Sequence, residues 1–472
     1  MTDFKLLING RLVPGASSMD VLNPATEEVV AACPTASEAQ LNEAVAAAKA
    51  AFPAWSKRPL SERAELLNKL ADAMMARHDE FARLLTQEQG KPLPMALWEV
   101  GGTAAGLKYF ASLTLPDKVI KDDAESKIIM QHAPLGVVAA ITPWNFPLIL
   151  LSIKVGPGLV AGNTMICKPA PTTPLTTLLF GELCAEILPP GVINVIADKN
   201  DLGSAITNHP DIAKVAFTGS TATGKKVMAS AASSLKRITL ELGGNDAAIV
   251  LDGVDPKEVA PKIFGGATMN SGQVCLAIKR VYAPESMYDE LCDELAKLAK
   301  EAVMGDGLEQ GTQLGPIQNK MQFEKVKEYI EVGRKDGKII AGGEAHEGKG
   351  YFIAPTIVRD ISHDSRLVKE EQFGPVLPVL SYTNLDDAIA KANDSEYGLG
   401  GTVWTNDLER GQAVASQIIS GTIWVNKHLD LPFDVPFGGA KQSGLGVEYG
   451  QEGLEEFTQQ KTINMAKAPL SA

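Results

Sequence analysis

The sequence predicts an α/β fold, and two observations carry this prediction. At roughly 150 residues per folding unit, the 472 residues suggest about three units, and a chain with 45% hydrophobic and 21% charged residues can bury large cores. From residue 136 onward, short runs rich in β-branched residues alternate with helical segments. Such alternation is typical of parallel sheets that are covered by helices on both faces.

The first alternating region predicts a doubly wound, Rossmann-like sheet. Its predicted strands cover residues 136–142, 164–168, 192–196, 214–218 and 236–242. The predicted crossover helices cover residues 151–162, 174–187, 201–210 and 219–232. In this architecture, nucleotides bind beyond the carboxyl ends of the strands.

A second alternating region follows from about residue 245 and predicts a second α/β domain. Its predicted strands lie within residues 247–251, 351–358, 376–382, 398–405 and 421–426. Its predicted helices cover residues 288–303, 325–337 and 385–394.

Two helices are predicted before these regions. Ser37 is a candidate N-cap with Gln40 three residues later, which predicts a surface helix over residues 37–52. From Ser61, apolar residues recur at spacings of three and four, which predicts one amphipathic helix over residues 61–85 with its Met pair in the core.

Two further segments fit neither domain. Residues 118–132 alternate polar and apolar side chains around a charged turn, and residues 457–465 read as a lone strand. Isolated hairpins are marginally stable, so both segments are expected to pair with another element or another chain.

Charge and cysteine content restrict the compartment and the partners. Lys and Arg number 44 against 57 Asp and Glu, a net charge of −13, which argues against nucleic acid as a partner. Five widely spaced cysteines without a C-x-x-C pattern favour a reducing compartment. The N-terminus lacks an export signal, and prolines interrupt the most apolar stretch, residues 135–151. We therefore expect a cytoplasmic protein without a membrane span.

The segment FTGSTATGKK, residues 217–226, leaves a predicted strand and enters a predicted helix. Its free backbone N–H groups are suited to hold phosphate. Gly219 to Lys225 also matches a P-loop, but Lys226 stands where a Mg²⁺-binding Ser or Thr is required. An NTPase therefore stays a rival hypothesis, and a Gly-rich turn without a ligand is the plainest alternative.

Three residues carry a possible acyl-transfer chemistry. Cys275 follows a Gly-rich stretch, although a cysteine between Val274 and Leu276 is more often buried and inert. Glu241 ends an apolar strand before two glycines, where it either turns to solvent or acts as a partly desolvated base. Asn145 lies between prolines, either as a turn residue or as an oxyanion donor.

Seven segments together resemble the NAD(P)-dependent aldehyde dehydrogenase superfamily, in the family's order and along the whole chain. They are ITPWNFPL (141–148), CKPAPTTP (167–174), FTGSTATG (217–224), LELGG (240–244), GQVC (272–275), EEQFGPVLPV (370–379) and PFGGAKQSG (436–444). The P-loop match is then best interpreted as a coincidence of glycines. A catalytically silent protein on the same fold is a second rival, for which the retained Cys, Glu and Asn are awkward.

The resemblance implies a hydrolytic mechanism. Cys275 would attack the aldehyde, and the Asn145 side chain with the Cys275 backbone N–H would hold the thiohemiacetal oxyanion. Glu241 would activate the water that hydrolyses the thioester to a free acid. Glu448 matches a second acidic position sometimes proposed to help proton transfer.

The resemblance also implies NAD⁺ as the cofactor, with NADP⁺ possible. Pro171 stands where many NAD-preferring relatives carry a Glu that binds the ribose. The implied cofactor residues are Thr142, Pro143, Trp144, Lys168, Pro171, Gly219, Ser220, Leu242, Glu371 and Phe373.

The residues that the resemblance places along the substrate tunnel are mostly apolar, which favours uncharged aliphatic or aromatic aldehydes. They are Phe146, Leu150, Ile153, Met269, Leu276, Leu431 and Phe437. His428 and Asp430 lie near the predicted entrance, where they either tune specificity or, as the favoured alternative, are solvated loop residues. The histidines show no metal-binding spacing, so no metal site is expected.

The resemblance implies three units. Residues 1–113 and 133–243 would form the NAD(P)-binding domain, residues 244–441 the catalytic domain, and residues 114–132 and 442–472 an oligomerisation element. A homodimer or homotetramer is therefore expected.

Overall fold

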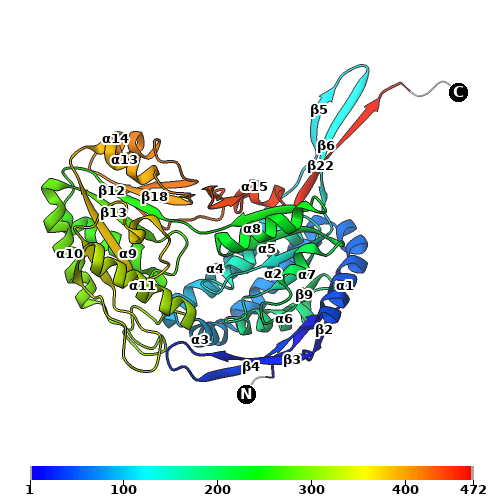
Figure 1. Ribbon diagram of the computed structural model, residues 1–472. Helices are drawn as coiled ribbons and strands as arrows, with labels where there is room; N and C mark the ends of the chain where they lie inside the picture. The colour runs from blue at the N-terminus through cyan, green and yellow to red at the C-terminus, as the bar shows by residue number, and fades with distance from the viewer. Residues whose placement is uncertain (1–2, 469–472) are drawn as a thin grey trace.

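The computed structural model describes residues 3–468 and contains two large sheets and a projecting β arm (Figure 1). The first sheet has eight strands in the order β2-β1-β9-β8-β7-β10-β11-β21. They are β1 (Leu6–Ile8), β2 (Arg11–Val13), β7 (Val137–Ile141), β8 (Thr164–Lys168), β9 (Ile193–Val195), β10 (Ile212–Thr218), β11 (Arg237–Glu241) and β21 (Gly444–Leu445). The five central strands lie where the alternation of the sequence predicts them, and the Rossmann-like α/β class is confirmed.

The five central strands run parallel, with their carboxyl ends at one edge. Ile141 pairs with Lys168 on one side and with Phe217 on the other, and Thr218 pairs with Glu241. After β7 the chain adds β8 and β9 on one side and then adds β10 and β11 on the other. This reversal creates a topological switch point between β7 and β10, where such sheets bind ligands.

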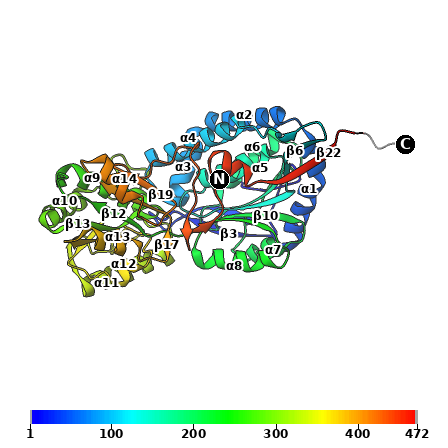
Figure 2. The ribbon, with the colours of Figure 1, turned by 90° about the horizontal axis from the view of Figure 1, so that it is seen from above.

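Helices cover both faces of this sheet, with α7 and α8 on one side and α2 and α6 on the other (Figure 2). The helices that belong to this region are α1 (Glu38–Lys57), α2 (Leu60–Ala76), α3 (His78–Gln89), α4 (Leu93–Ser112), α5 (Ile149–Val160), α6 (Leu175–Ile187), α7 (Gly203–Asn208) and α8 (Thr221–Ala232). Strands β7 and β8 are buried along their whole length, as expected for strands between two helical layers.

The N-terminal helices confirm one prediction and correct another. Helix α1 (Glu38–Lys57) begins after Ser37, and reciprocal hydrogen bonds between Ser37 and Gln40 form the predicted capping box. The single helix predicted from Ser61 is wrong. Arg77, at φ −113° and ψ 23°, separates α2 from α3.

The predicted core position of the Met pair is also half wrong. Met74 is fully buried, whereas Met75 is 41% exposed. Helix α2 therefore buries a narrower face than the continuous helix was expected to bury.

The second sheet has seven strands in the order β14-β15-β16-β13-β12-β18-β19, parallel except at β14. They are β12 (Asp246–Val250), β13 (Ile278–Pro284), β14 (Lys338–Ala341), β15 (Thr356–Arg359), β16 (Val376–Tyr382), β18 (Gly400–Trp404) and β19 (Thr422–Val425). Its helices are α9 (Pro256–Thr268), α10 (Tyr288–Glu301), α11 (Lys320–Asp336), α12 (Arg366–Lys369), α13 (Leu385–Asn393) and α14 (Leu408–Ala415). Two separate apolar clusters pack on this second region, as expected for a second α/β unit.

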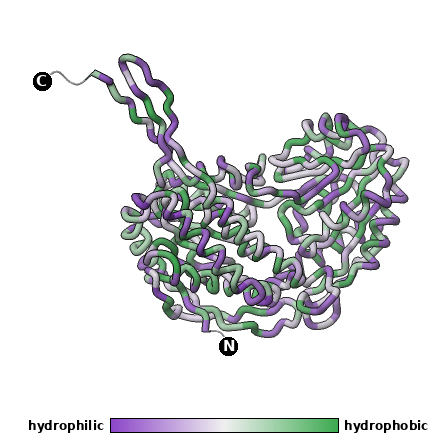
Figure 3. Tube along the Cα trace, turned by 180° about the vertical axis from the view of Figure 1, so that it is seen from behind, coloured by the Kyte–Doolittle hydropathy of each residue, from purple (hydrophilic) through white to green (hydrophobic). Residues whose placement is uncertain are grey.

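The two segments that fitted neither domain pair with each other. Strands β5 (Lys118–Asp122), β6 (Ser126–Pro134) and β22 (Thr458–Ala466) form an antiparallel sheet in the order β22-β6-β5. This arm projects from the first region, and hydrophilic and hydrophobic residues are interspersed along it (Figure 3). Val119 and Ile120 are each more than half exposed on it.

Short pairs complete the fold. Strands β3 (Ser17–Leu22) and β4 (Val29–Thr35) form an antiparallel pair, as do β17 (Tyr397–Gly398) and β20 (Ala440–Lys441). Helix α15 (Gly450–Glu455) precedes β22. Within residues 3–468, every helix is too short or too polar to cross a membrane.

Candidate active site

The predicted motifs converge where the two large sheets meet. The Asn145 side chain, after β7, donates from Nδ2 to the backbone carbonyl of Gln273, 2.9 Å away in the loop before β13. The Gly244 N–H, after β11, donates to Glu371 Oε1 at 2.9 Å. Segments separated by more than a hundred residues are thus joined at the carboxyl edge of the first sheet.

Cys275 is the only partly exposed thiol among five free cysteines, and the other four are buried. Burial raises the pKa of its thiol to about 12, against the opposing effect of the Lys279 charge. Lys279 donates from Nζ to the Cys275 carbonyl at 2.6 Å and to the Val274 carbonyl at 3.0 Å. The nucleophile candidate therefore lies on a fixed backbone and needs a base to lose its proton.

The loop before Cys275 is strained. Asn270, Ser271 and Gly272 all have positive φ, between 50° and 74°, which is costly for the first two. A side chain at Gly272 would collide with the Gly374 carbonyl of the EEQFGP motif. The glycine of GQVC therefore allows the nucleophile loop and that motif to touch.

Buried amides stabilise this strained loop. Gln273 donates from Nε2 to the Asn270 carbonyl at 2.9 Å, and its Oε1 accepts from the Gln318 N–H at 2.8 Å. Ser271 donates from Oγ to the Gly315 carbonyl at 2.7 Å. These contacts hold the backbone of Cys275 in one conformation.

Asn145 is 4% exposed and lies beside the Cys275 loop. One of its two amide hydrogens is used by the Gln273 carbonyl, which leaves the second for another acceptor. The arrangement is suited to an oxyanion donor whose orientation is fixed by the nucleophile loop itself.

Glu241 ends β11 and is 4% exposed, yet neither carboxylate oxygen has a hydrogen-bond partner within the described part of the chain. Burial raises its pKa well above the usual range, the Glu448 charge raises it further, and the Lys154 charge lowers it. A buried carboxylate without partners is poised to exchange a proton with water or substrate.

Glu448 lies next to this carboxylate and is itself 1% exposed. It forms an ion pair with Lys154 of α5, whose Nζ also donates to Thr218 Oγ1 at 2.8 Å. The sequence singled out Glu448 but missed Lys154. A lone lysine within the apolar helix ILLSIKVGPGLV was the available signal, because a buried lysine requires a partner.

The predicted cofactor residues surround the switch point. Ser220 caps α8 and accepts from the Thr223 N–H at 3.3 Å, and Gly219 donates its N–H to the Glu241 carbonyl at 3.0 Å. Trp144 and Phe373 meet edge to face with centroids 5.4 Å apart. Thr142 Oγ1 is buried and lacks a partner among the described residues.

The remaining cofactor candidates differ in exposure. Lys168 is almost fully buried and pairs with the buried carboxylate of Asp198 at 2.7 Å. Pro171 is half-buried in the loop that follows, and Leu242 is buried against Gly224 of α8. Pro143 lies half-buried after β7.

All seven predicted substrate residues and Cys275 belong to one contiguous apolar cluster. Its fully buried members among them are Phe146, Ile153, Leu276 and Phe437, and its partly exposed members are Leu150, Met269, Leu431 and Cys275.

The two entrance-loop residues behave differently. His428 bonds through Nε2 to the Leu276 carbonyl at 2.7 Å, and burial lowers its pKa to about 4. Because a carbonyl only accepts, Nε2 carries the proton, and with this low pKa the ring is neutral at pH 7. The favoured interpretation of His428 as a solvated residue is therefore wrong, while Asp430 is exposed and paired with Lys427.

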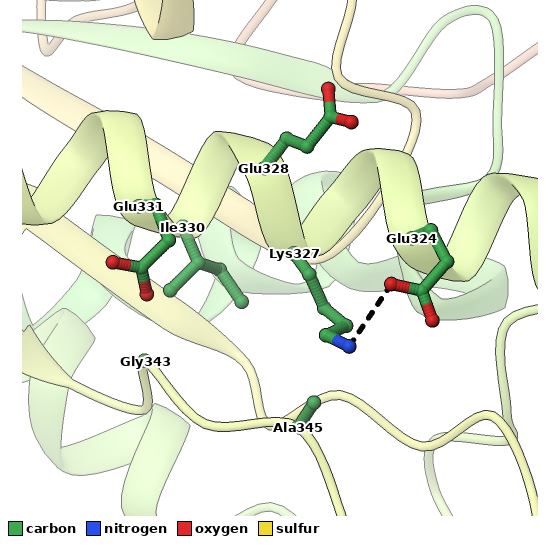
Figure 4. A pocket seen from close by; sticks show the side chains of 7 residues that line it. All are labelled: Glu324, Lys327, Glu328, Ile330, Glu331, Gly343 and Ala345. Carbon is green, nitrogen blue, oxygen red and sulfur yellow. Dashed lines mark hydrogen bonds and ion pairs between the residues drawn. The ribbon is translucent and has the colours of Figure 1, made fainter.

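A cavity of about 280 Å³ lies away from these residues. It is bordered by α11 and the segment of Gly343 and Ala345, and its charged lining includes a Lys327–Glu324 pair at 3.0 Å (Figure 4). None of the predicted site residues lines it, so it is not part of the candidate active site. Among residues 3–468, no cluster of three or more His, Cys, Asp or Glu side chains is arranged to hold a metal ion.

The chain is similar to known proteins over nearly its whole length. The model of the aldehyde dehydrogenase family matches residues 12–463. Phenylacetaldehyde dehydrogenase of Pseudomonas fluorescens is 40% identical over 98% of this chain and 96% of its own length. Aldehyde dehydrogenase 1A1 of Rattus norvegicus is 40% identical over 98% and 94%. The NAD⁺ complex of an aldehyde dehydrogenase from Bacillus cereus is 39% identical, with a TM-score of 0.97 over 99% of this chain and 97% of that one.

Proposed function

Because this chain belongs to the aldehyde dehydrogenase family and oxidises aldehydes to acids with a nicotinamide cofactor, we propose that Cys275, Asn145 and Glu241 carry out the reaction. One observation carries this assignment above the others. Glu241 is buried without a hydrogen-bond partner among the described residues, close enough to Cys275 for its charge to affect the thiol pKa. An unpaired carboxylate beside the one accessible thiol is best explained as a base.

The residues around the switch point fit NAD⁺. Thr142 offers a buried hydroxyl without a protein partner, and the N-terminus of α8 at Ser220 offers backbone N–H groups for the pyrophosphate. Glu371 and Phe373 would hold the nicotinamide ribose and ring, with Trp144 and Pro143 beside them. When bound there, NAD⁺ would supply the acceptor for the two electrons and the hydrogen that leave the aldehyde carbon.

The chain's own residues account for the other steps. The Cys275 thiol loses its proton to solvent water, Sγ bonds to the carbonyl carbon, and the second Asn145 N–H with the Cys275 N–H receives the oxyanion. Oxidation turns the thiohemiacetal into a thioester on Cys275. Glu241 then takes a proton from the attacking water, the acid is released, and the thiolate returns.

We further propose that NAD⁺ is preferred to NADP⁺. Lys168, which would bind the adenosine ribose, is already paired with Asp198 at 2.7 Å. This carboxylate neutralises the lysine and would repel a 2′-phosphate. The expected kcat/KM for NAD⁺ is at least tenfold above that for NADP⁺. Asp198→Asn should lower this ratio by raising the kcat/KM for NADP⁺.

The substrates proposed here are uncharged aliphatic or aromatic aldehydes. The apolar character of the seven predicted substrate residues, which belong to the same core cluster as Cys275, supports this class, and Asp430 is engaged with Lys427 rather than free for a cation. Production of reduced cofactor is measured for phenylacetaldehyde, hexanal, betaine aldehyde and succinic semialdehyde. We expect the first two to be preferred, and a higher kcat/KM for either charged compound would contradict the proposal.

Cys275→Ala provides the direct test of the nucleophile. It should remove turnover with every aldehyde of the panel, because no other described cysteine is exposed. Cys33→Ala is the matched control, since Cys33 is buried in the first region and should leave kcat unchanged. Full activity of Cys275→Ala would overturn the assignment.

The predicted domain boundaries, the oligomer and the compartment are also proposals. The arm of β5, β6 and β22 exposes Val119 and Ile120, which supports a homodimer or a dimer-based tetramer. Five free thiols support a cytoplasmic, reducing location. Light scattering of wild type and Ile120→Lys measures the oligomeric state. An unchanged mass in the variant would argue against the arm as the interface.

A further inference from the structure

A buried ion pair that the proposed mechanism does not use lies beside Asn145. Lys91, in the turn between α3 and α4, and Glu99, on α4, have no exposed side-chain surface and are joined through Nζ and Oε2. Burying two charges is expensive, and such a pair rarely adds stability relative to apolar residues of similar size. Stability alone therefore does not explain this ion pair, and its contacts indicate another role.

Besides its pair with Glu99, the Lys91 side chain contacts the segment after β7. Its Nζ donates to the Asn145 carbonyl at 2.7 Å and lies 3.8 Å from the centroid of the Phe146 ring. Asn270 of the nucleophile loop donates to the same Asn145 carbonyl at 3.1 Å. The backbone of the oxyanion candidate is thus held from two sides.

Glu99 holds the next residues along the chain. Its Oε1 accepts from the N–H groups of Leu148 at 3.0 Å and Ile149 at 3.3 Å. Helix α5 has no side-chain N-cap of its own, so this carboxylate from α4 supplies one. The two charged groups together fix every residue from Asn145 to the start of α5 except Pro147.

We propose that Lys91 and Glu99 are positioning residues that fix the Asn145 amide at the reaction centre through the backbone of residues 145–149. The inference rests on the proposed role of Asn145 as oxyanion donor. Neither side chain touches the reacting atoms. Their effect on the reaction passes through the Asn145 backbone and the first turn of α5.

The test compares Lys91→Met with wild type in single turnover. We expect the rate of acylation, seen as the burst of reduced cofactor, to fall about 10- to 100-fold, a part of what loss of an oxyanion donor costs. The dissociation constant of NAD⁺ should change less than twofold, and kcat should fall more than KM rises. Glu99→Gln keeps a carbonyl for the α5 N–H groups and should lose about tenfold.

Lys236→Met is the matched control. Lys236 is also a buried lysine that donates to backbone carbonyls, those of His209 and Ile212, at the opposite end of the first sheet. It should lower the thermal midpoint while leaving the acylation rate unchanged. If Lys91→Met and Glu99→Gln fold and acylate at the wild-type rate, or weaken NAD⁺ binding instead, the proposal is overturned.

Asn145→Ala distinguishes the positioning role of Lys91 and Glu99 from the oxyanion role of Asn145. If Asn145→Ala acylates slowly and Lys91→Met acylates at the wild-type rate, only the positioning role is contradicted. If Asn145→Ala acylates at the wild-type rate, the oxyanion role on which the positioning role rests is contradicted as well. In the double variant Lys91→Met/Asn145→Ala, we expect no further loss beyond Asn145→Ala, because both changes remove the same interaction. Additive losses would contradict the coupling.

Discussion

Two buried lysine–glutamate pairs lie along α5, one before its start and one in its middle. Lys91 and Glu99 hold the chain that enters the helix, while Lys154 and Glu448 meet inside the helix region. Both pairs are almost fully buried, so burial and charge do not distinguish them. Their neighbours do.

Around the first pair, every charged atom ends on a protein partner. Glu99 accepts from two backbone N–H groups and from Lys91, and Lys91 also reaches the Asn145 carbonyl. Beside the second pair lies Glu241, whose two oxygens accept from no described group. A satisfied pair fixes geometry, whereas a pair next to an unsatisfied carboxylate controls when that carboxylate carries a proton.

Among the variants of residues at and beside these two pairs, Glu241→Gln is expected to have the largest effect on turnover. Loss of a general base costs about 10²- to 10⁴-fold, so steady-state turnover should fall by a factor in this range. The acylation burst should persist, because the thioester forms but is hydrolysed slowly. Stopped-flow absorbance of reduced cofactor measures both phases, and unchanged steady-state turnover would argue against the base assignment.

Lys154→Met should have a smaller, pH-dependent effect. The Lys154 charge lowers the Glu241 pKa, so its removal raises that pKa and reduces the ionised base at neutral pH. The acid limb of the kcat profile should therefore move to higher pH, with turnover reduced at neutral pH and restored toward the wild-type value at higher pH. Lys91→Met should lower the profile without moving this limb. A shift in both variants would erase the distinction between the two pairs.

Much of this organisation was predictable from the sequence. The central strands of the first sheet follow from their apolar runs, and the α1 cap follows from Ser37 and Gln40. The break at Arg77 did not follow, because the apolar spacing continues through it. There the chain turns while the Arg77 guanidinium is held by Glu80 and by Glu182, which is distant in sequence.

The site residues likewise fall into two groups, those that the sequence predicts and those that it does not. Cys275, Glu241 and Asn145 stand in motifs with local signals, such as a strand end before glycines. Lys91 and Glu99 have no such signal, because their importance comes from contacts across 49 residues or more of chain. His428 was misjudged for the same reason, since its partner at Leu276 lies 152 residues away.

The smallest effect is expected from Glu448→Gln, and its direction is opposite to that of Lys154→Met. The Glu448 charge raises the Glu241 pKa, so its removal lowers that pKa and leaves Lys154 to lower it further. The acid limb should therefore move to lower pH, and turnover at neutral pH should change less than about threefold, because Glu241 is then more fully ionised. The measurement is the same pH profile, with Glu452→Gln as a control on the nearby helix α15. If Glu448→Gln instead lowers kcat equally at every pH, Glu448 moves a proton itself rather than acting through the charge it places beside Glu241.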